Sequence, residues 1–256
     1  MIKITFLGTG TSQGIPVIGS DHPVSFSDDL KDKRLRSSIL IEYKDFNFVI
    51  DCGPDFRQQM LKTNCRKLDA IIFTHEHADH TTGIDDVRPY FFRQGKIPIY
   101  LHERVLNSLH NRFAYIFDPK QKYPGAPDFE VNLITKENDF QIFGLNITPI
   151  ESVHYKLPIL GFRLGKFAYL TDVKTISDKE MLKLNGLDAL VINALRYESH
   201  PSHLNIEEAL KIVDQVKPKQ TFFTHISHNM GFHEEVCSNL PKSVSLAFDG
   251  LVLEVD

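Results

Sequence analysis

The chain has 256 residues, of which 42% are hydrophobic and 24% are charged, a balance typical of a folded globular protein. This composition excludes extended disorder, collagen-like repeats and a coiled coil. The 29 Lys and Arg residues against 33 Asp and Glu residues give a net charge of -4, so the chain has no overall basic excess for binding a nucleic acid. Three scattered cysteines are typical of a reducing compartment, and no apolar stretch is long enough to span a membrane. We therefore expect a cytoplasmic protein with neither a signal peptide nor a membrane contact.

Alternating hydrophobicity in the first part of the chain predicts a strand over Ile2–Leu7 and a hairpin formed by Ile39–Tyr43 and Phe46–Ile50. A helix is expected over Asp55–Asn64, followed by a short buried strand over Ala70–Thr74. The opening of the fold is thus an antiparallel sheet.

The segment Gly8–Gly14 between the first two strands is rich in glycine. It lacks the Gly-Lys-Ser/Thr ending of a phosphate-binding loop and the helix that follows a dinucleotide site. Two interpretations stay open, a flexible turn above the sheet and a loop that lines an active site.

The second half of the chain alternates predicted strands with two helices, one over Ser177–Asn185 and one capped by Asn205 with Glu208 three residues on. The strands are expected over Phe140–Phe143, Ile147–Ile150, Gly161–Leu164, Phe167–Leu170, Ala189–Asn193, Thr221–Thr224, Ser243–Phe248 and Leu251–Val255. No linker or change of composition interrupts the series, so we predict one layered α/β domain over residues 1–256.

The segment Phe73–His80 contains three histidines and an aspartate directly after a buried strand. Imidazole is a common ligand of zinc and related ions, and a carboxylate adds negative charge beside it. His75 and His77 can hold one ion, while Asp79 and His80, at the start of the next helix, face a neighbouring ion. A solvated loop is the alternative, and four metal-type ligands at this spacing make it the weaker one.

Further candidate ligands follow the ends of later predicted strands. They are His154, Asp172 and His225. Polar ligands at strand ends are what a metal site at the edge of a sheet requires, and a carboxylate such as Asp172 can bridge two ions. A lone histidine such as His154 would not indicate a metal ligand by itself. We assign it as a candidate ligand only because it could complete the set formed by the other residues.

The motif Thr74–His80 resembles the Thr-His-x-His-x-Asp-His motif of the metallo-β-lactamase superfamily, and the later ligands follow in the same order. The resemblance implies an αββα four-layer sandwich with a cleft for two divalent metal ions, zinc or manganese. It also implies the division of ligands between the ions: His75, His77 and His154 on one, Asp79, His80 and His225 on the other, and Asp172 between them.

Shorter motifs are similar to one branch of the superfamily, which contains the phosphoribosyl cyclic phosphate phosphodiesterases of carbon-phosphorus lyase pathways and is related to tRNA 3′-processing endonucleases. These motifs are Phe6–Pro16, Arg36–Ser38, Asp51–Asp55, Ser202–His203 and Thr224–His228. In that branch the histidine matching His203 is a proposed catalytic group, and an imidazole can protonate a leaving oxygen near neutral pH. The branch also implies a homodimer.

One departure from the branch concerns a structural zinc site, which its members often form with three cysteines in the early loop. Here that loop reads Gly19–Ser25, with His22 and Asp21 but no thiolate. Together with His228 these residues make an incomplete site, so we expect no tight structural zinc and interpret His228 as a hydrogen-bonded structural histidine.

The resemblance and the ligands together predict a metal-dependent phosphodiesterase that opens a small cyclic phosphodiester to a phosphomonoester. The ions would polarise the phosphoryl group and supply hydroxide, Asp79 and Asp172 would orient it, and His203 would assist the departing oxygen. Arg36 and Ser37, or less surely Arg34, are expected to bind the substrate; a solvated loop arginine is the alternative.

Four alternatives remain: a cyclic-nucleotide phosphodiesterase, a tRNA 3′-processing nuclease, a thioester or lactone hydrolase, and a non-catalytic module that binds metal or ligand. No long basic arm for a tRNA is evident, which favours a small substrate over a long nucleic acid. A glutamate would usually replace His77 in flavin-linked reductases of this fold, which disfavours redox chemistry. The presence of all seven ligands counts against the non-catalytic module.

Overall fold

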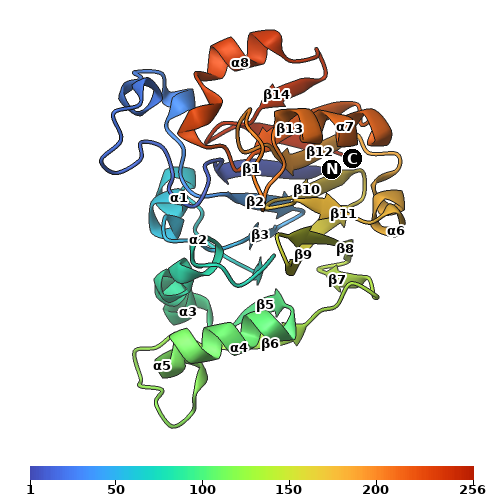
Figure 1. Cartoon of the computed structure of the whole chain (residues 1–256). Helices are drawn as coiled ribbons and strands as arrows, with labels where there is room; N and C mark the ends of the chain where they lie inside the picture. The colour runs from blue at the N-terminus through green and yellow to red at the C-terminus, as the bar shows by residue number, and fades with distance from the viewer.

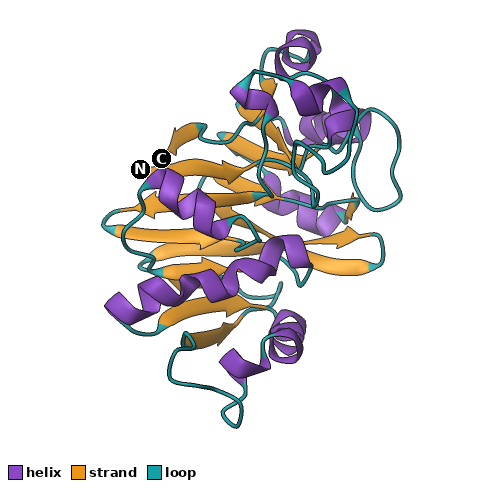
Figure 2. Ribbon diagram, turned by 90° about the vertical axis from the view of Figure 1, so that its left-hand side faces the viewer, coloured by secondary structure: helices purple, strands orange, loops and turns teal.

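Two β-sheets pack face to face in the computed structural model, which describes residues 1–256, and helices cover the outer face of each sheet (Figures 1 and 2). This confirms the predicted αββα sandwich, the fold of the metallo-β-lactamases. The first and last strands pair with each other, Ile2 opposite Val255, so the two termini lie side by side.

The first sheet has the order β15-β1-β2-β3-β4-β5-β6. Its strands are β1 (Ile2–Gly8), β2 (Ser38–Tyr43), β3 (Phe46–Ile50), β4 (Ala70–Ile72), β5 (Ile97–Leu101), β6 (Phe129–Leu133) and β15 (Val252–Val255). Strands β15 to β3 pair antiparallel, whereas β3 to β6 pair parallel. The parallel half brings the carboxyl ends of β3 and β4 to the same edge.

The second sheet has the order β11-β8-β9-β10-β12-β13-β14, with β7 paired to β8. Its strands are β7 (Phe140–Ile142), β8 (Leu145–His154), β9 (Leu157–Leu164), β10 (Phe167–Leu170), β11 (Thr175–Ile176), β12 (Ala189–Asn193), β13 (Gln220–Thr224) and β14 (Val244–Leu246). Here β10, β12, β13 and β14 run parallel, so their carboxyl ends also meet at one edge.

Helices form the two outer layers, and their buried faces define separate apolar cores with each sheet. The helices are α1 (Phe56–Thr63), α2 (Ala78–Thr81), α3 (Arg88–Gln94), α4 (Glu103–Arg112), α5 (Ala114–Phe117), α6 (Asp178–Met181), α7 (Ile206–Val216) and α8 (His233–Asn239). The predicted capping box of α7 is present, since the Asn205 side chain accepts from the Glu208 amide and the Glu208 side chain accepts from the Asn205 amide.

The central core lies between the two sheets and is built from alternate residues of their strands. Phe6 of β1 contacts Phe222 of β13 across this interface, with ring centroids 6.1 Å apart. Phe48, Phe162 and Tyr169 are fully buried there as well. Packing of this kind fixes the distance between the sheets and therefore the positions of the loops that leave them.

The structure differs from the sequence predictions at several elements. Strand β11 and helix α8 were not predicted, and β9 begins at Leu157, four residues before its predicted start. Residues 82–134 form α3, β5, α4, α5 and β6, none of which was predicted. Strand β8 continues to His154, four residues beyond the predicted end. The helix expected over Ser177–Asn185 divides into α6 and a 3₁₀ turn at Leu182–Leu184.

The assignment of residues 1–256 to one domain stays a prediction. None of the helices is long and apolar enough to cross a lipid bilayer.

Candidate metal centre

The predicted ligands come together at the ends of strands, at one edge of the sandwich. His75 and His77 follow β4, Asp79 and His80 lie in the short helix α2, and His154 is the last residue of β8. The remaining two are Asp172, the second residue after β10, and His225, which directly follows β13. Ligands from both sheets therefore meet at this edge.

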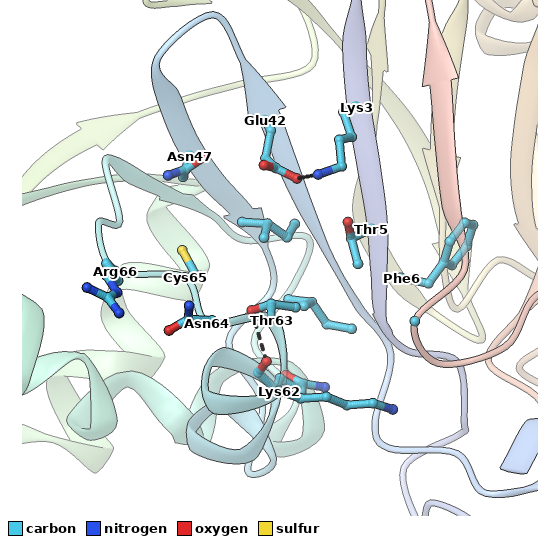
Figure 3. Close-up of a pocket in the computed structure, with 14 residues that line it drawn as sticks. Lys3, Thr5, Phe6, Glu42, Asn47, Lys62, Thr63, Asn64, Cys65 and Arg66 are labelled. Carbon is cyan, nitrogen blue, oxygen red and sulfur yellow. Dashed lines mark hydrogen bonds and ion pairs between the residues drawn. The ribbon is translucent and has the colours of Figure 1, made fainter.

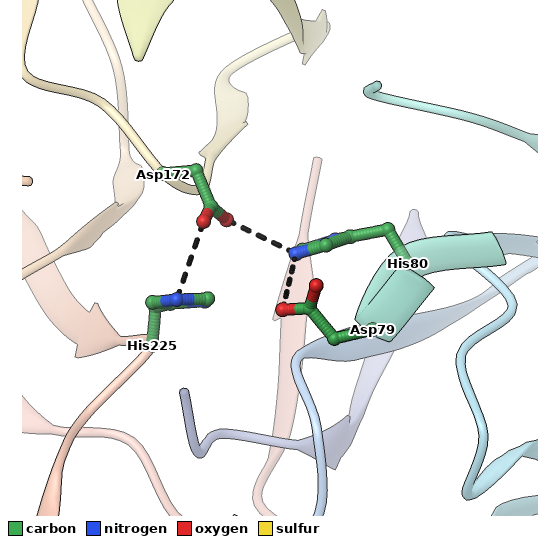
Figure 4. A group of neighbouring side chains, drawn as sticks. All are labelled: Asp79, His80, Asp172 and His225. Atoms are coloured by element: carbon green, nitrogen blue, oxygen red, sulfur yellow. Dashed lines mark ion pairs between the residues drawn. The ribbon is translucent and has the colours of Figure 1, made fainter. Parts of the chain in front are cut away.

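Four of these residues form a tight group, shown in Figure 4. The ligand atoms of Asp79, His80, Asp172 and His225 all lie within 4.8 Å of one another. His80 Nε2 is 3.2 Å from Asp79 Oδ2 and 3.2 Å from Asp172 Oδ2. His225 Nε2 is 3.2 Å from Asp172 Oδ1, so the two oxygens of Asp172 face different histidines. This is the set expected to hold one of the two ions.

The other expected set, His75, His77 and His154, forms a ring of neighbouring imidazoles. The ring centroids are 4.6 Å apart for His75 and His77, 5.1 Å for His77 and His154, and 5.8 Å for His75 and His154. His154 also groups with Asp172 and His203 within 4.8 Å. Asp172 thus lies beside both sets of ligands.

Hydrogen bonds at Nδ1 leave the Nε2 atoms of several histidines free for a ligand. His80 Nδ1 is 2.7 Å from Asp51 Oδ2, and His154 Nδ1 donates to the Ser202 carbonyl oxygen over 2.8 Å. The Nε2 atoms of His75 and His80 are buried and have no hydrogen-bond partner. Orphaned imidazole nitrogens beside two carboxylates fit divalent metal ions, because metal-bound histidines usually donate their other nitrogen to a carboxylate or carbonyl.

Burial and charge set the protonation of these ligands. Burial lowers the pKa of His225 to about 4 and lowers that of His75 far below its ordinary value, so both imidazoles are neutral, as metal ligation requires. Burial would also lower the pKa of His80, but the carboxylates of Asp79, Asp172 and Asp51 outweigh it and raise that pKa. The site therefore concentrates negative charge that a cation would balance.

Three residues of the site have a left-handed backbone. The φ angles are 67° at Asp51, 61° at Asp172 and 55° at His225; Asp51 and His225 directly follow a strand, and Asp172 is the second residue after one. Residues other than glycine adopt this region at a cost in free energy, and such strain gathers at functional sites. The turn of the backbone directs each side chain into the cluster.

His203, predicted as a catalytic group, contacts the cluster directly. Its Nε2 atom is 3.1 Å from Asp172 Oδ1, and its ring centroid is 4.6 Å from that of His154. Its Nδ1 atom lies 3.0 Å from Ser202 Oγ and 3.1 Å from Nδ1 of His200. His200 Nδ1 accepts from the Ser202 amide, so it faces His203 as an acceptor. Both nitrogens of His203 therefore face acceptors, which suits a group that donates a proton.

The three residues expected at the substrate are engaged elsewhere. Arg34 is buried and donates to Thr9 and to the Ala247 carbonyl, and Ser37 is buried with its hydroxyl donating to the Gly10 carbonyl. Neither side chain is free for a ligand in this arrangement. Arg36 is half-buried; it pairs with Asp55 over 3.2 Å and donates to the Ser12 carbonyl. The roles of Arg36 and Ser37 stay predictions without support from these contacts.

The glycine-rich segment lies against the site, since Thr11 Oγ1 is 3.1 Å from His225 Nε2. The early loop brings His22 beside His228, with ring centroids 5.1 Å apart. His228 Nδ1 is buried without a hydrogen-bond partner, so the hydrogen bond expected there is not present at that atom. Asp21 is exposed, and these three residues do not form a metal-ligand group.

Sequence reasoning missed three residues that support the ligands. Asp51 accepts from His80 and from the amide of Thr74 over 2.9 Å, Glu76 pairs with Arg104 over 2.8 Å, and His200 contacts His203. Asp51 had a usable signal, because it directly follows the predicted strand Phe46–Ile50, as other ligands follow theirs. Glu76 had none, since its partner Arg104 is distant in sequence, and His200 lies three residues before His203 outside any ligand motif.

Among the cavities of the molecule, two that are large enough for a small substrate differ in the residues that line them. One, of about 350 Å³, lies on the outer side of the first sheet beside α1, where Lys3 pairs with Glu42 over 2.7 Å (Figure 3). No predicted ligand lines it. The other, of about 530 Å³, is lined by His77 and His154 of the cluster and by the turn between β8 and β9. Only the second cavity can bring a substrate to the metal centre.

The fold and the cluster of ligands at the strand ends are those of a metallo-hydrolase. A model of the beta-lactamase superfamily domain matches residues 46–226, and the chain belongs to this superfamily.

Three relatives place the chain within that superfamily. A crystal structure of a new diphosphatase from the PhnP family is 40% identical, has a TM-score of 0.93, and the match covers 100% of this chain and 98% of that one. A Porphyromonas gingivalis protein named octanoyltransferase is 38% identical over 257 residues, which cover 100% of this chain and 52% of the relative. A ribonuclease Z of Methanococcus maripaludis is 31% identical over 211 residues, 72% of this chain and 60% of the relative. The chain thus spans about half the length of the P. gingivalis relative. These likenesses confirm the resemblance to the phosphodiesterase branch and its relation to tRNA 3′-processing enzymes.

Proposed function

We propose that the protein is a metal-dependent phosphodiesterase that opens a small cyclic phosphodiester to a phosphomonoester. The observation that carries the proposal is the position of His203, whose Nε2 atom lies 3.1 Å from Asp172 in a cluster of metal-type ligands. The likeness to the PhnP-family diphosphatase, 40% identical over the whole chain, supports phosphate ester chemistry.

Two divalent ions would be held by the predicted ligands, with zinc and manganese both suited to a His/Asp set. His75, His77 and His154 would hold one ion and Asp79, His80 and His225 the other, with Asp172 beside both sets. When bound, such ions supply Lewis-acid polarisation of the phosphoryl group and a hydroxide at neutral pH.

The residues of the chain prepare this chemistry in three ways. Asp51 and the Ser202 carbonyl fix the ring orientations of His80 and His154, so that their Nε2 atoms face the cluster. Asp79 and Asp172 orient the attacking oxygen. His203, held at Nδ1 by its neighbours, donates a proton from Nε2 to the departing oxygen; such proton transfer contributes about 10²- to 10⁴-fold to the rate.

The test combines turnover with metal content. Protein loaded with zinc or with manganese is mixed with ribose 1,2-cyclic phosphate and with a 2′,3′-cyclic nucleotide, and phosphorus NMR follows ring opening. For His203→Gln we expect turnover to fall at least about 100-fold with two ions per chain retained. Loss of metal in this variant would make His203 a ligand instead, and absence of turnover in the metal-loaded wild type would contradict the proposal.

A second candidate is hydrolysis of an acyl thioester, favoured by the name of the P. gingivalis relative, octanoyltransferase. An acyl thioester added to the same assay separates the two candidates: the phosphodiesterase leaves it intact. The homodimer and the cytoplasmic location stay predictions.

A further inference from the structure

We propose that the turn between β8 and β9 forms a nucleotide subsite beside the metal centre, in which Tyr155 stacks on a nucleobase and Lys156 pairs with a second phosphate group. This inference rests on the proposed function and names the substrate class within it. A nucleotide ester is favoured over a sugar phosphate without a base.

The position of the turn is the first argument. The cavity of about 530 Å³ is lined by Tyr155, Lys156 and Leu157 and by Pro201 and Ser202. His77 and His154, whose ring centroids are 5.1 Å apart, line it as well. Ser202 directly precedes His203, so a molecule in this cavity adjoins both the ligands and the proposed acid. The volume lies within the range of small-molecule sites and exceeds what a lone phosphate group needs.

The backbone of Tyr155 is the second argument. His154 pairs with Leu157, so Tyr155 and Lys156 form a two-residue turn, and φ of Tyr155 is 59°. Glycine is the usual residue where the first position of such a turn has a positive φ, because a bulky side chain is strained there. The ring is 61% exposed, and its hydroxyl makes no hydrogen bond with the protein. Neither the turn nor the core requires a tyrosine at this position.

The charge of Lys156 is the third argument. Its Nζ atom lies 5.3 Å from the centre of the Tyr155 ring, and no carboxylate is within ion-pair distance. The turn therefore presents an aromatic face and an unpaired cation together. A planar heterocycle that also carries phosphate matches both, since bases stack on aromatic side chains and phosphates pair with ammonium groups.

The test measures binding, so that it does not depend on turnover. Protein loaded with two zinc ions is titrated in a calorimeter with adenosine 3′-monophosphate and with ribose 5-phosphate. For Tyr155→Asn we expect the affinity for the adenosine probe to fall about tenfold to a hundredfold, with the affinity for ribose 5-phosphate unchanged. Tyr155→Phe should retain both affinities.

The unfolding temperature distinguishes loss of the subsite from damage to the fold. Damage to the fold would lower it, whereas the proposed role of Tyr155 predicts that it rises in Tyr155→Asn. Asparagine tolerates a positive φ better than tyrosine, so Tyr155→Asn should raise the unfolding temperature while it weakens the adenosine probe. Tyr123→Asn, at another exposed tyrosine remote from the cavity, is the matched control and should change neither affinity.

Lys156 is tested with a probe that carries two phosphates. Adenosine 3′,5′-bisphosphate should bind the wild type more tightly than the monophosphate, and Lys156→Gln should remove roughly a tenfold preference. Lys156→Arg should keep it.

The outcomes separate this inference from the proposed function. Unchanged adenosine binding in Tyr155→Asn, or an equal loss for both probes, would overturn the subsite. If no phosphodiester is turned over but the adenosine probe still depends on Tyr155, the proposed reaction fails while the subsite stands.

Discussion

Asp51 supports the metal centre without belonging to the predicted ligands. It is fully buried and accepts from His80, from the Thr74 amide and from the Thr74 hydroxyl. Through these contacts it fixes which nitrogen of His80 faces Asp79 and Asp172. A carboxylate behind a ligating imidazole is a common device for setting its orientation and basicity.

Replacing Asp51 with asparagine tests this role. The amide would present a donor to His80 Nδ1 and so force the proton onto Nε2, the atom needed by the metal. We expect metal affinity to fall about 10- to 100-fold with the fold retained, measured by competition with a coloured chelator. Retained affinity in the variant would mean that His80 Nε2 is not a ligand.

The sequence predicted the candidate metal ligands well, because each is a polar side chain that follows a strand. It did not predict which polar residues of the loops are buried. All seven predicted ligands converge at one edge. Six of them follow strands of the parallel parts of the two sheets, whereas His154 ends β8, which pairs antiparallel. Arg34 and Ser37 could not be assigned in the same way. A buried arginine and a loop arginine look alike in sequence, and only tertiary packing places Arg34 against Thr9 and His233.

At the level of elements, the segment after β3 packs closely on helix α2. A Cβ atom added to Gly53 would lie 2.0 Å from the Asp79 carbonyl oxygen, and one added to Gly83 would lie 2.1 Å from the Gly53 carbonyl oxygen. Glycine is therefore required at both positions for α2 to approach the sheet. This approach sets how far Asp79 and His80 reach toward Asp172.

We expect Gly53→Ala to displace α2 and to destabilise the protein by at least about 1–3 kcal/mol, as overpacking does. Urea unfolding measures the stability, and a metal titration measures the ligand displacement. Gly186→Ala is the comparison, because no atom lies within 4 Å of the added carbon and only backbone strain at φ 73° is felt there. Equal losses in both variants would show that packing on α2 is not the cause.

Strands with strict alternation or a continuous buried run were predicted well, such as β3, β10 and β12, because both patterns are readable locally. The segment 82–134 was not. Pro98 weakens the strand signal of β5, whereas β6 alternates apolar and polar residues over Phe129–Leu133 and was predictable from its pattern. Both strands lie beyond β4 toward the edge of the first sheet; β5 pairs with β4 and β6, and β6 is the edge strand.

Across the whole molecule, buried polar groups connect the C-terminal part of the chain to Thr9 and to the residues just before β2. Asp249 accepts from the Leu35 amide over 2.7 Å and from the Thr9 hydroxyl over 2.8 Å. His233 faces the Arg34 guanidinium over 3.2 Å. Burial raises the pKa of Asp249 to about 6 and lowers the pKa of His233 to about 4. The two groups titrate in the same range with opposite effects on folding.

The signs follow from proton binding. Between about pH 4 and 6 folded Asp249 retains a proton that the unfolded chain releases, so its contribution to stability falls as pH rises. Between about pH 4 and 6.5 unfolded His233 binds a proton that the folded form excludes, so its contribution rises with pH.

We therefore expect the wild type to gain stability over His233→Gln as pH rises from about 4 to 6.5, on the order of 1 kcal/mol. Urea unfolding at several pH values gives the difference, in which titration of the metal ligands cancels. A difference that does not vary with pH would contradict the protonation assigned to His233.

The ligands of the metal centre come from both sheets, residues 75–80 from the first and His154, Asp172 and His225 from the second. Ions held between them would cross-link two layers of the sandwich whose strands are far apart in the chain. Since such binding requires the folded state, each tenfold rise in free ion above saturation adds about 1.4 kcal/mol per site to the free energy of unfolding. Chelation should therefore lower the unfolding temperature in steps that follow ion occupancy, and the persistence of the folded protein in a cell would track the supply of the metal.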